Sequence, residues 1–273
     1  MIKPEATLII SVYNETRFLK IVLDSVKKQT FRNFEIIISE DGEHEHVKSF
    51  VESYPFEQPF QHLSQPDEGW RKNRALNRAI LSAKANYLIF IDGDCILHQR
   101  FIEEHIRKSG KKRILGGKRL KMNREMTNIF LNENPDLSKI ERYLIKNVFL
   151  QKGKGIRFFE EGFYMNSHGL LCFVSWIRHM HQLKGCNMSF SKEAILSLNG
   201  FDEDYTSPAI GEDIDLTWRF RKAGYHLHSL RNLAVEYHLY HKESWTDQEE
   251  NIRIMKEKQK IGASRCKNGI IKL

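Results

Sequence analysis

Short apolar runs alternate with amphipathic stretches along the first hundred residues. Residues 6–12, 34–39 and 87–92 are rich in Ile, Leu, Val and Phe, which predicts strands buried on both faces. Residues 18–28 and 71–83 carry apolar side chains three and four positions apart, the spacing of amphipathic helices. Strand, polar turn, helix and strand in this order predict an α/β fold with a mixed, mostly parallel, Rossmann-like sheet flanked by helices.

The rest of the chain gives a less regular pattern. Residues 101–180 predict a helix near 102–106, a strand at 114–115 and then a mixture of helix and loop. Within this part, residues 168–177 are apolar but too short to cross a membrane. They would form core, the wall of an acceptor pocket or an interfacial segment, of which core is the commonest. Beyond it we expect strands at 183–190 and 234–241, and helices at 192–198 and about 212–223.

The strand at 87–92 runs into Asp92-Gly93-Asp94. In an open α/β sheet ligands bind beyond the carboxyl ends of the strands, and in an extended chain both carboxylates would point the same way. Two neighbouring carboxylates repel each other unless a cation lies beside them, so a divalent metal is their natural partner. An ordinary Asp-Gly turn is the alternative.

Acidic residues and histidines recur near the end of the chain. Glu212, Asp213 and Asp215 precede a predicted helix, where they would either compensate the helix dipole or do chemistry. His238 and His241 lie three positions apart, and two histidines this close favour metal binding more than one alone.

Basic residues are concentrated in two places. Arg71, Arg74 and Arg78 fall about one turn apart near a helix start, which favours either phosphate binding or a solvated face. The formal net charge is +8, and nine Lys or Arg lie between 107 and 124 without a single carboxylate. Such a run is most often a solvated face; the alternatives are a patch for phosphates, anionic lipid or nucleic acid.

The four cysteines show no CxxC spacing, so the sequence predicts reduced thiols without a zinc knuckle or disulfide framework. The N-terminus carries no basic-then-apolar signal, and no apolar run is long enough to span a bilayer. We therefore expect a cytoplasmic protein, soluble or peripheral at the inner face of the cell membrane.

Six motifs follow one another along the chain: Ser11-Val-Tyr-Asn-Glu15, Glu40-Asp-Gly42, Asp92-Gly-Asp94, Gly185-Cys-Asn-Met-Ser-Phe190, Asn199-Gly-Phe-Asp-Glu203 and Gly211-Glu-Asp-Ile-Asp-Leu216. In this order they resemble the motifs of the inverting family-two glycosyltransferases, which have the GT-A fold. Asp67-Glu-Gly-Trp-Arg71 and His238-Leu-Tyr-His241 further resemble a bacterial subgroup related to galactosyl- and N-acetylgalactosaminyltransferase domains. Two motifs depart from the family pattern, with Ser11 in place of Pro and Glu40 in place of Asp.

This resemblance implies transfer of a sugar from a UDP-sugar, with inversion, to a hydroxyl of a glycan or lipid-linked glycan in cell-surface polysaccharide or lipopolysaccharide synthesis. Asp94 and His238 would bind Mn²⁺ or Mg²⁺, with His241 as the substitute ligand. Asp213 would be the general base and Glu212 would position the acceptor. Contacts to the nucleotide sugar are expected from Ser11, Tyr13, Glu15, Glu40, Asp41, Arg71, Asp92, Gly93 and Asn187.

The resemblance also divides the chain. It implies a catalytic domain over 1–245, in which a variable insertion (about 121–180) separates a nucleotide-binding half (about 1–120) from an acceptor half (about 181–245), before a helical tail. Two other functions compete. A metal-dependent nucleotidyltransferase would need a basic, NTP-gripping loop after the first strand, and a non-catalytic binder of membranes or nucleic acid would leave the acidic motifs unexplained; we expect no nucleic-acid partner.

Overall fold

The computed structural model describes residues 3–273 except 134–135, 137–138, 151–154, 167–168, 170–176, 209 and 243–246, with backbone alone at 147–150. Cys172 and most of the apolar stretch 168–177 lie outside the described residues. No helix in the described part of the chain is both long enough and apolar enough to span a bilayer.

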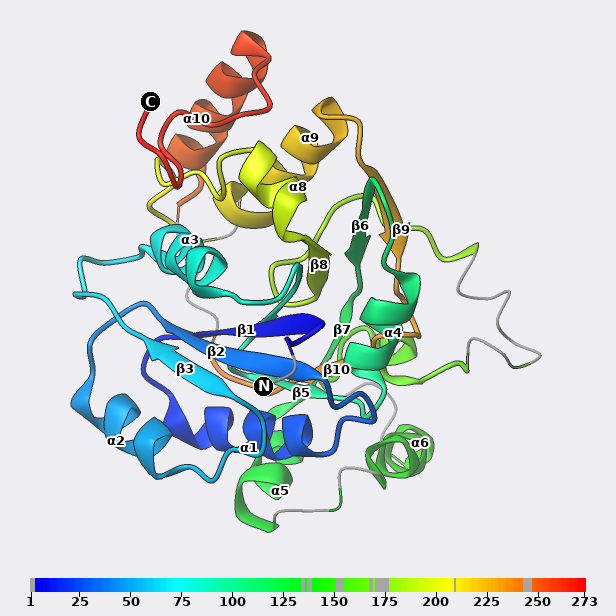
Figure 1. The fold of residues 1–273 in the computed structure, drawn as a ribbon. Coiled ribbons are helices and arrows are strands. Elements are labelled where there is room, and N and C mark those ends of the chain that lie inside the picture. The colour runs from blue at the N-terminus through cyan, green and yellow to red at the C-terminus, as the bar shows by residue number, and fades with distance from the viewer. Residues whose placement is uncertain are drawn as a thin grey trace.

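A seven-stranded sheet forms the centre of the molecule (Figure 1). Its first four strands in spatial order run parallel to one another. β8 (Met188–Ser191) is antiparallel to both of its neighbours, and β9 (His226–Ser229) is parallel to β6 (Arg113–Gly116). This confirms the predicted mixed, mostly parallel sheet. In spatial order the strands are β3 (Phe60–Leu63), β2 (Phe34–Glu40), β1 (Ala6–Val12), β4 (Tyr87–Asp92), β8 (Met188–Ser191), β6 (Arg113–Gly116) and β9 (His226–Ser229).

Helices cover both faces of this sheet, which is why β1, β2 and β4 are mostly apolar and almost entirely buried. One core cluster packs α1 (Thr16–Lys27), α2 (Glu45–Ser53) and α4 (Phe101–Lys108) against the sheet. A second packs α3 (Lys72–Ser82), α8 (Lys192–Ser197) and α9 (Asp215–Lys222) on the other face.

The strand register brings distant polar residues to one edge. Ser11 of β1 lies opposite Ser39 of β2 on one side and Asp92 of β4 on the other. The chain leaves β1 in a turn whose Glu15 side chain accepts a hydrogen bond from the backbone N–H of Arg17 and so caps α1, as the polar residues there predicted. The carboxyl ends of three parallel strands therefore open into one crevice.

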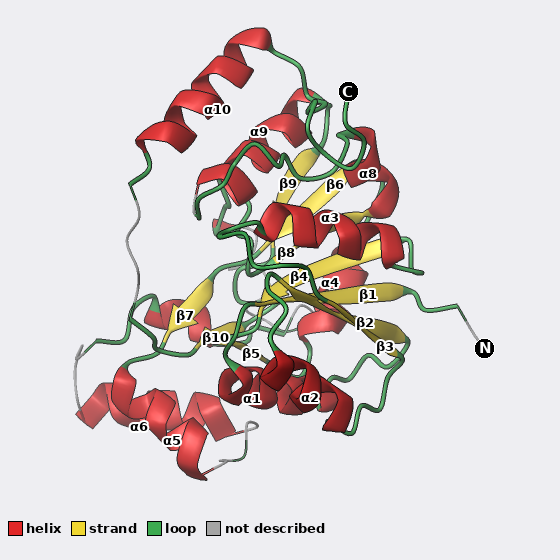
Figure 2. Cartoon of the chain, turned by 90° about the vertical axis from the view of Figure 1, so that its left-hand side faces the viewer, coloured by secondary structure: helices red, strands yellow, loops and turns green. Residues whose placement is uncertain are grey.

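A smaller sheet lies beside this crevice (Figure 2). It contains β5 (Cys95–Leu97), β10 (Glu236–His238) and β7 (Arg119–Lys121), and His238 pairs with Cys95. Because Cys95 follows Asp94 directly, this register places His238 beside the end of β4. The region predicted as an insertion holds α5 (Arg124–Glu133), α6 (Ile140–Leu150) and the 3₁₀ turn Phe159–Gly162, and α10 (Glu249–Ile261) occupies the predicted helical tail.

Two predicted strands are shorter than expected, because residues 183–187, 234–235 and 239–241 form irregular backbone instead. The short strands β3, β5, β7 and β9, and helix α2, were not predicted at all. Strands of three or four residues carry too few positions for a period-two pattern to stand out.

Candidate active site

A cavity of about 760 Å³ opens at the carboxyl ends of β1, β2 and β4. Asp41 shapes one wall, since its carboxylate accepts hydrogen bonds from Gln65 Nε2 and the backbone N–H of Arg71, both at 2.8 Å. Tyr13 donates its hydroxyl hydrogen to Asp67 at 2.7 Å across the opening. The walls include nine predicted site residues: Ser11, Tyr13, Glu15, Asp41, Asp92, Gly93, Asp94, His238 and His241.

Gly93 is required by the close approach of two strand ends. Its N–H donates to Ser11 O at 2.8 Å, and an added Cβ would lie 3.0 Å from that same oxygen and 3.1 Å from Val12 Cγ2. The chain turns at Gly93 and Asp94 instead of continuing as a strand. The two carboxylates therefore have separate partners, which corrects the expectation that extended backbone would point both the same way.

Asp94 lies against the histidine pair. Its Oδ2 is 3.3 Å from His238 Nε2 and 3.1 Å from His241 Nε2, and the two imidazole nitrogens are 3.2 Å apart. His238 is buried in β10, whereas His241 is half-exposed at the cavity mouth. Burial would raise the pKa of Asp94, but hydrogen bonds from the two histidines hold it well below the usual value.

These three residues fit a divalent cation. When two ligand atoms each lie about 2.1 Å from an ion and the two bonds form a right angle, the atoms are roughly 3 Å apart. The three ligand atoms of this cluster have that spacing. One carboxylate with two imidazoles suits Mn²⁺ better than Mg²⁺, which prefers oxygen ligands. The triangular spacing brings the imidazole nitrogens of His238 and His241 about equally close to Asp94, so both histidines are candidate ligands.

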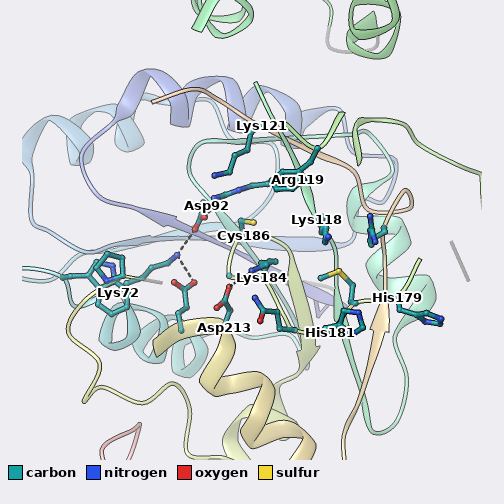
Figure 3. Close-up of a pocket in the computed structure, with 18 residues that line it drawn as sticks. Lys72, Asp92, Lys118, Arg119, Lys121, His179, His181, Lys184, Cys186 and Asp213 are labelled. Carbon is teal, nitrogen blue, oxygen red and sulfur yellow. Dashed lines mark hydrogen bonds and ion pairs between the residues drawn. The ribbon is translucent and has the colours of Figure 1, made fainter. Parts of the chain in front are cut away.

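Asp92 is held by two cationic side chains. Lys72 Nζ lies 2.7 Å from its Oδ1 and 2.9 Å from Glu212 Oε1, and Arg119 Nη1 lies 3.2 Å from its Oδ2 (Figure 3). Although burial opposes its charge, the two carboxylates raise the pKa of Lys72 above the usual range. Lys72 thus joins the end of β4 to Glu212.

Sequence reasoning missed Lys72, and the three arginines that it singled out here contact the loop before α3. Arg71 Nη1 donates to the carbonyl of Trp70, Arg74 pairs with Glu68, and Arg78 donates to Ser64 O. Successive residues of a helix are rotated by about 100°, so the point where the helix starts decides which side chain faces the cavity. The signal in the sequence that could have identified Lys72 was its position directly after Arg71.

Replacing Lys72 by Met should destabilise the protein and strongly lower activity. The partly buried carboxylates of Asp92 and Glu212 would then repel each other, at a cost of up to about 3 kcal/mol. The double variant Lys72→Met/Glu212→Gln removes that repulsion and should regain much of the stability but not the activity. Urea unfolding of both variants measures this; equal stability of Lys72→Met and the wild-type protein would contradict it.

A second cavity, of about 860 Å³, adjoins the first and shares Trp70, Lys72, Asp92, Arg119 and Pro208 with it. Glu212 and Asp213 line it from the single π-helical turn Ile210–Ile214 that leads into α9 (Figure 3). Both carboxylates therefore face the second cavity, and Glu212 lies beside Lys72, which lines both cavities.

The acidic motif separates into two environments. Burial raises the pKa of Asp213, an effect that Lys184, 4.0 Å away, partly offsets. Burial likewise raises the pKa of Glu212, whose Oε1 lies 1.9 Å from where a Cβ on Gly185 would be. Asp215 instead points into the core, where it pairs with Arg219 at 2.6 Å and accepts from Tyr205 at 3.0 Å.

Three predicted contacts lie outside both cavity linings: Arg71, Glu40 and Asn187. Glu40 is buried and accepts from the backbone N–H of His44, with the imidazoles of His44 and His62 at 2.9 and 2.8 Å. These bonds stabilise the turn after β2 from within. Because the Glu40 side chain has no exposed surface, direct contact with a base would require this turn to open.

Asn187 likewise has its bonds inside the protein. It is fully buried, donates to Ala234 O at 2.9 Å and accepts from His105 Nε2 at 3.2 Å. The other ring nitrogen of His105 then accepts from Ser189, which is 2.7 Å away. The backbone N–H of Asn187 also donates to Lys184 O at 2.8 Å, so these bonds order the turn that carries Lys184 and Gly185.

The basic run between 107 and 124 does not form one face. Arg107 pairs with Glu104 on α4, and Lys112 lies over the ring of Tyr225. Lys118, Arg119 and Lys121 line the second cavity.

Sequence reasoning did not predict that two of the cysteines lie close together. Cys95 and Cys186 are buried free thiols whose sulfurs lie within 4.8 Å of each other and of a carboxylate oxygen of Asp92.

Comparison with known proteins decides the family. The model for glycosyl transferase family 2 matches residues 7–172. The chain belongs to glycosyl transferase family 2. A model described as the N-terminal domain of galactosyltransferase matches residues 171–242, so both parts of the motif resemblance are confirmed.

Relatives of this family-two chain include two polysaccharide synthases. Chondroitin synthase of Escherichia coli is 22% identical over 93% of this chain and 38% of its own length. Hyaluronan synthase of Pasteurella multocida is 23% identical over 94% of this chain and 28% of its own length. The chain thus spans less than two fifths of either relative.

Solved structures establish the GT-A fold. The mannosyltransferase PcManGT from Pyrobaculum calidifontis, in complex with GDP-Man and Mn²⁺, is 15% identical with a TM-score of 0.56, over 96% of this chain and 63% of its own. Staphylococcus aureus TarS 1–349 in complex with UDP-GlcNAc is 14% identical with a TM-score of 0.58, over 92% of this chain and 65% of its own.

Proposed function

We propose that the chain is a metal-dependent, inverting glycosyltransferase that moves a sugar from a UDP-sugar to a glycan hydroxyl. The observation that carries this proposal is the junction of the two cavities at Asp92, Lys72 and Glu212. The cavity with the Asp94 and histidine cluster would take the nucleotide, and the cavity with Asp213 would take the acceptor. A reacting anomeric carbon would then lie at the junction.

The residues of the first cavity suit a nucleoside diphosphate. Tyr13 and Asp41 would contact the base and ribose, Asp92 the ribose, and Asp94, His238 and His241 would hold the metal. When bound, a divalent cation supplies Lewis-acid neutralisation of the charge that develops on the leaving diphosphate. Arg119 and Lys72 add fixed positive charge beside the same place.

Asp213 would act as the general base. It accepts the acceptor hydroxyl proton while that oxygen forms its bond to the anomeric carbon and the bond to the diphosphate breaks. Attack from the face opposite the leaving group inverts the anomeric configuration. Glu212, held by Lys72, would accept hydrogen bonds from the acceptor and fix its orientation.

The relatives favour a role in polysaccharide synthesis. Chondroitin synthase and hyaluronan synthase both bear names of glycan polymer synthases. We propose that this chain contributes to cell-surface polysaccharide or lipopolysaccharide synthesis, acting on a glycan or lipid-linked glycan. Cytoplasmic location and contact with an anionic membrane remain predictions from the sequence.

Ligand-induced stabilisation tests the donor. UDP should raise the melting temperature with Mn²⁺ present and not with EDTA, by an amount equivalent to about 2.7 kcal/mol when its concentration is a hundred times Kd. GDP, ADP and UTP in parallel separate a UDP-sugar transferase from a nucleotidyltransferase, which would respond to UTP most. A UDP-sugar panel assayed for slow Mn²⁺-dependent hydrolysis then identifies the sugar. Stabilisation by UDP that EDTA leaves intact would refute metal dependence.

A further inference from the structure

Two buried thiols lie beside Asp92, where the two cavities meet. Cys95 begins β5, and Cys186 belongs to the irregular turn that precedes β8. Both are free cysteines, and their sulfurs lie within 4.8 Å of each other. Cys186 also lines the second cavity, and Figure 3 shows it between Asp92 and Lys184. A small molecule that enters this cavity can therefore reach the pair from the Cys186 side.

The surroundings of Cys186 favour its thiolate form. A hydrogen bond with the Cys95 thiol and the guanidinium charge of Arg119 lower the pKa of Cys186, although burial and the Asp92 carboxylate oppose this. The buried carboxyl group of Glu236 also forms a hydrogen bond with the Cys186 sulfur and lowers its pKa further. Because the thiolate is the reactive form of cysteine, Cys186 is the better nucleophile of the two.

The same cluster suits a metal ion less well than an oxidant. Two thiols and a carboxylate are ligands of the kind that hold Zn²⁺. However, Arg119 Nη1 lies 3.2 Å from Asp92 Oδ2 and 3.8 Å from the Cys95 sulfur. Lys72 holds the other oxygen of Asp92 at 2.7 Å. These two fixed positive charges would repel a dication, whereas they stabilise a thiolate.

We propose that Cys95 and Cys186 form a site of reversible oxidation, at which hydrogen peroxide produces an intramolecular disulfide. The Cys186 thiolate attacks one peroxide oxygen; the S–O bond forms, the O–O bond breaks, and the departing hydroxide takes a proton and leaves as water. The Cys95 sulfur then attacks the Cys186 sulfur, so that the S–S bond forms and the S–O bond breaks. The released hydroxide takes the Cys95 thiol proton as a second water, and two electrons pass from the thiols to the peroxide.

Closing this disulfide would move Cys186 more than Cys95. Cys95 pairs with His238 in the small sheet, and its sulfur lies 3.3 Å from Asp94 Oδ1. Residues 183–187 form irregular backbone, which the buried side chain of Asn187 holds at one end. Because the sulfurs of a disulfide are only about 2.05 Å apart, the part of the turn around Cys186 would be drawn toward β5.

This displacement would reach the two carboxylates of the second cavity. Gly185 lies so close to Glu212 that an added Cβ would be 1.9 Å from its Oε1, and Lys184 Nζ is 4.0 Å from Asp213 Oδ2. A shift of the turn would therefore displace Glu212 and change the distance of Lys184 from the candidate base. The disulfide is independent of the proposed function, but the loss of transfer that we expect from it rests on that function.

Peptide mapping after mild oxidation tests the site. The variant Cys172→Ser/Cys266→Ser retains only this pair of the four cysteines. After a few equivalents of hydrogen peroxide, and alkylation of the remaining thiols, we expect a peptide that joins Cys95 to Cys186 and that dithiothreitol separates. Wild-type protein mapped in parallel gives the same test if the variant does not fold. An unmodified pair, or oxidation that ends as a sulfinic acid on Cys186, would refute the disulfide.

Activity measurements then locate the effect. Once catalase has removed the peroxide, Mn²⁺-dependent hydrolysis of a UDP-sugar should be about 10- to 100-fold slower and should recover with dithiothreitol, because small displacements of catalytic groups cause losses of this size. Cys186→Ala and Cys95→Ala should each resist peroxide. Cys266→Ser is the matched control: Cys266 is also a buried thiol, but burial raises its pKa to about 11, so this variant should stay as sensitive as wild type.

The outcomes separate the disulfide from the function. If the disulfide forms but reduced and oxidised protein hydrolyse the UDP-sugar equally fast, the effect on activity is refuted and the proposed function stands. If the reduced protein does not bind UDP with Mn²⁺, the proposed function fails, and peptide mapping alone decides the disulfide. Zn²⁺ that stays bound at one ion per chain after dialysis, and is lost from Cys186→Ala, would assign the thiols to a metal and overturn the inference.

Discussion

Replacing Asp94 by Ala should remove Mn²⁺-dependent binding of UDP, with a loss of affinity of more than about 100-fold. Loss of a hydrogen-bond partner to a metal ligand already costs about 10- to 100-fold in metal affinity, and Asp94 is a candidate ligand itself. It supplies the one carboxylate of a cluster whose three ligand atoms lie 3.1–3.3 Å apart. Titration of UDP into variant and wild type, with Mn²⁺ and with EDTA, measures the effect.

Matched variants show whether the loss belongs to the cluster. His238→Ala and His241→Ala should each weaken the same binding, because their nitrogens are nearly equidistant from Asp94. Glu52→Ala removes an exposed carboxylate of α2 and should behave like wild type. Should Asp94→Ala bind UDP and Mn²⁺ normally, Asp92-Gly93-Asp94 is an ordinary turn and the metal site lies elsewhere.

Strands buried on both faces could be predicted from sequence, because burial on both faces requires a nearly continuous run of apolar residues. β1 and β4 match their predicted bounds, and β2 extends only one residue beyond them. The end of the helix predicted at 192–198 was equally clear from sequence, since Asn199 and Gly200, which follow it, both adopt the positive φ angles that these residue types tolerate.

Side-chain direction could not be predicted in this way. Arg71 and Lys72 are adjacent and alike in charge, yet only Lys72 reaches Asp92, because the helix begins at Lys72. Asn187 is a polar residue within a family motif, and nothing in its own sequence context reveals that His105 and Ala234 take up its bonds. Such details depend on pairings between distant segments, which no local pattern encodes.

The same limit applies to the electrostatics of the acidic motif. From sequence, the helix dipole lowers the pKa of Asp213 while neighbouring carboxylates raise it, so the net direction is undetermined. The structure supplies the missing quantity, burial, and the pKa is raised. It also separates Asp215 from the other two acids, because Arg219 draws it into the core.

Asp213→Asn should lose transfer activity by about 10²–10⁴-fold, because an amide accepts no proton at neutral pH and general-base catalysis contributes about that factor. Folding should be little affected, since burial already disfavours the ionised carboxylate, as the raised pKa of Asp213 reports. Binding of UDP with Mn²⁺ should also remain, because Asp213 lines the second cavity only.

The pH dependence gives this prediction a second, independent readout. A base must be ionised to act, so wild-type kcat/KM should rise with pH through the raised pKa of Asp213 and level off above it. Lys184, which holds that pKa down, sets the position of the rise, and Lys184→Met should move it to higher pH. Asp215→Asn is the matched control: it breaks the buried pair with Arg219 and should cost about 3–5 kcal/mol of stability, while the residual folded enzyme keeps the wild-type pH profile. Near-normal turnover of Asp213→Asn on the true acceptor would transfer the role of base to Glu212, whose carboxylate faces the same cavity and is likewise shifted to a higher pKa by burial.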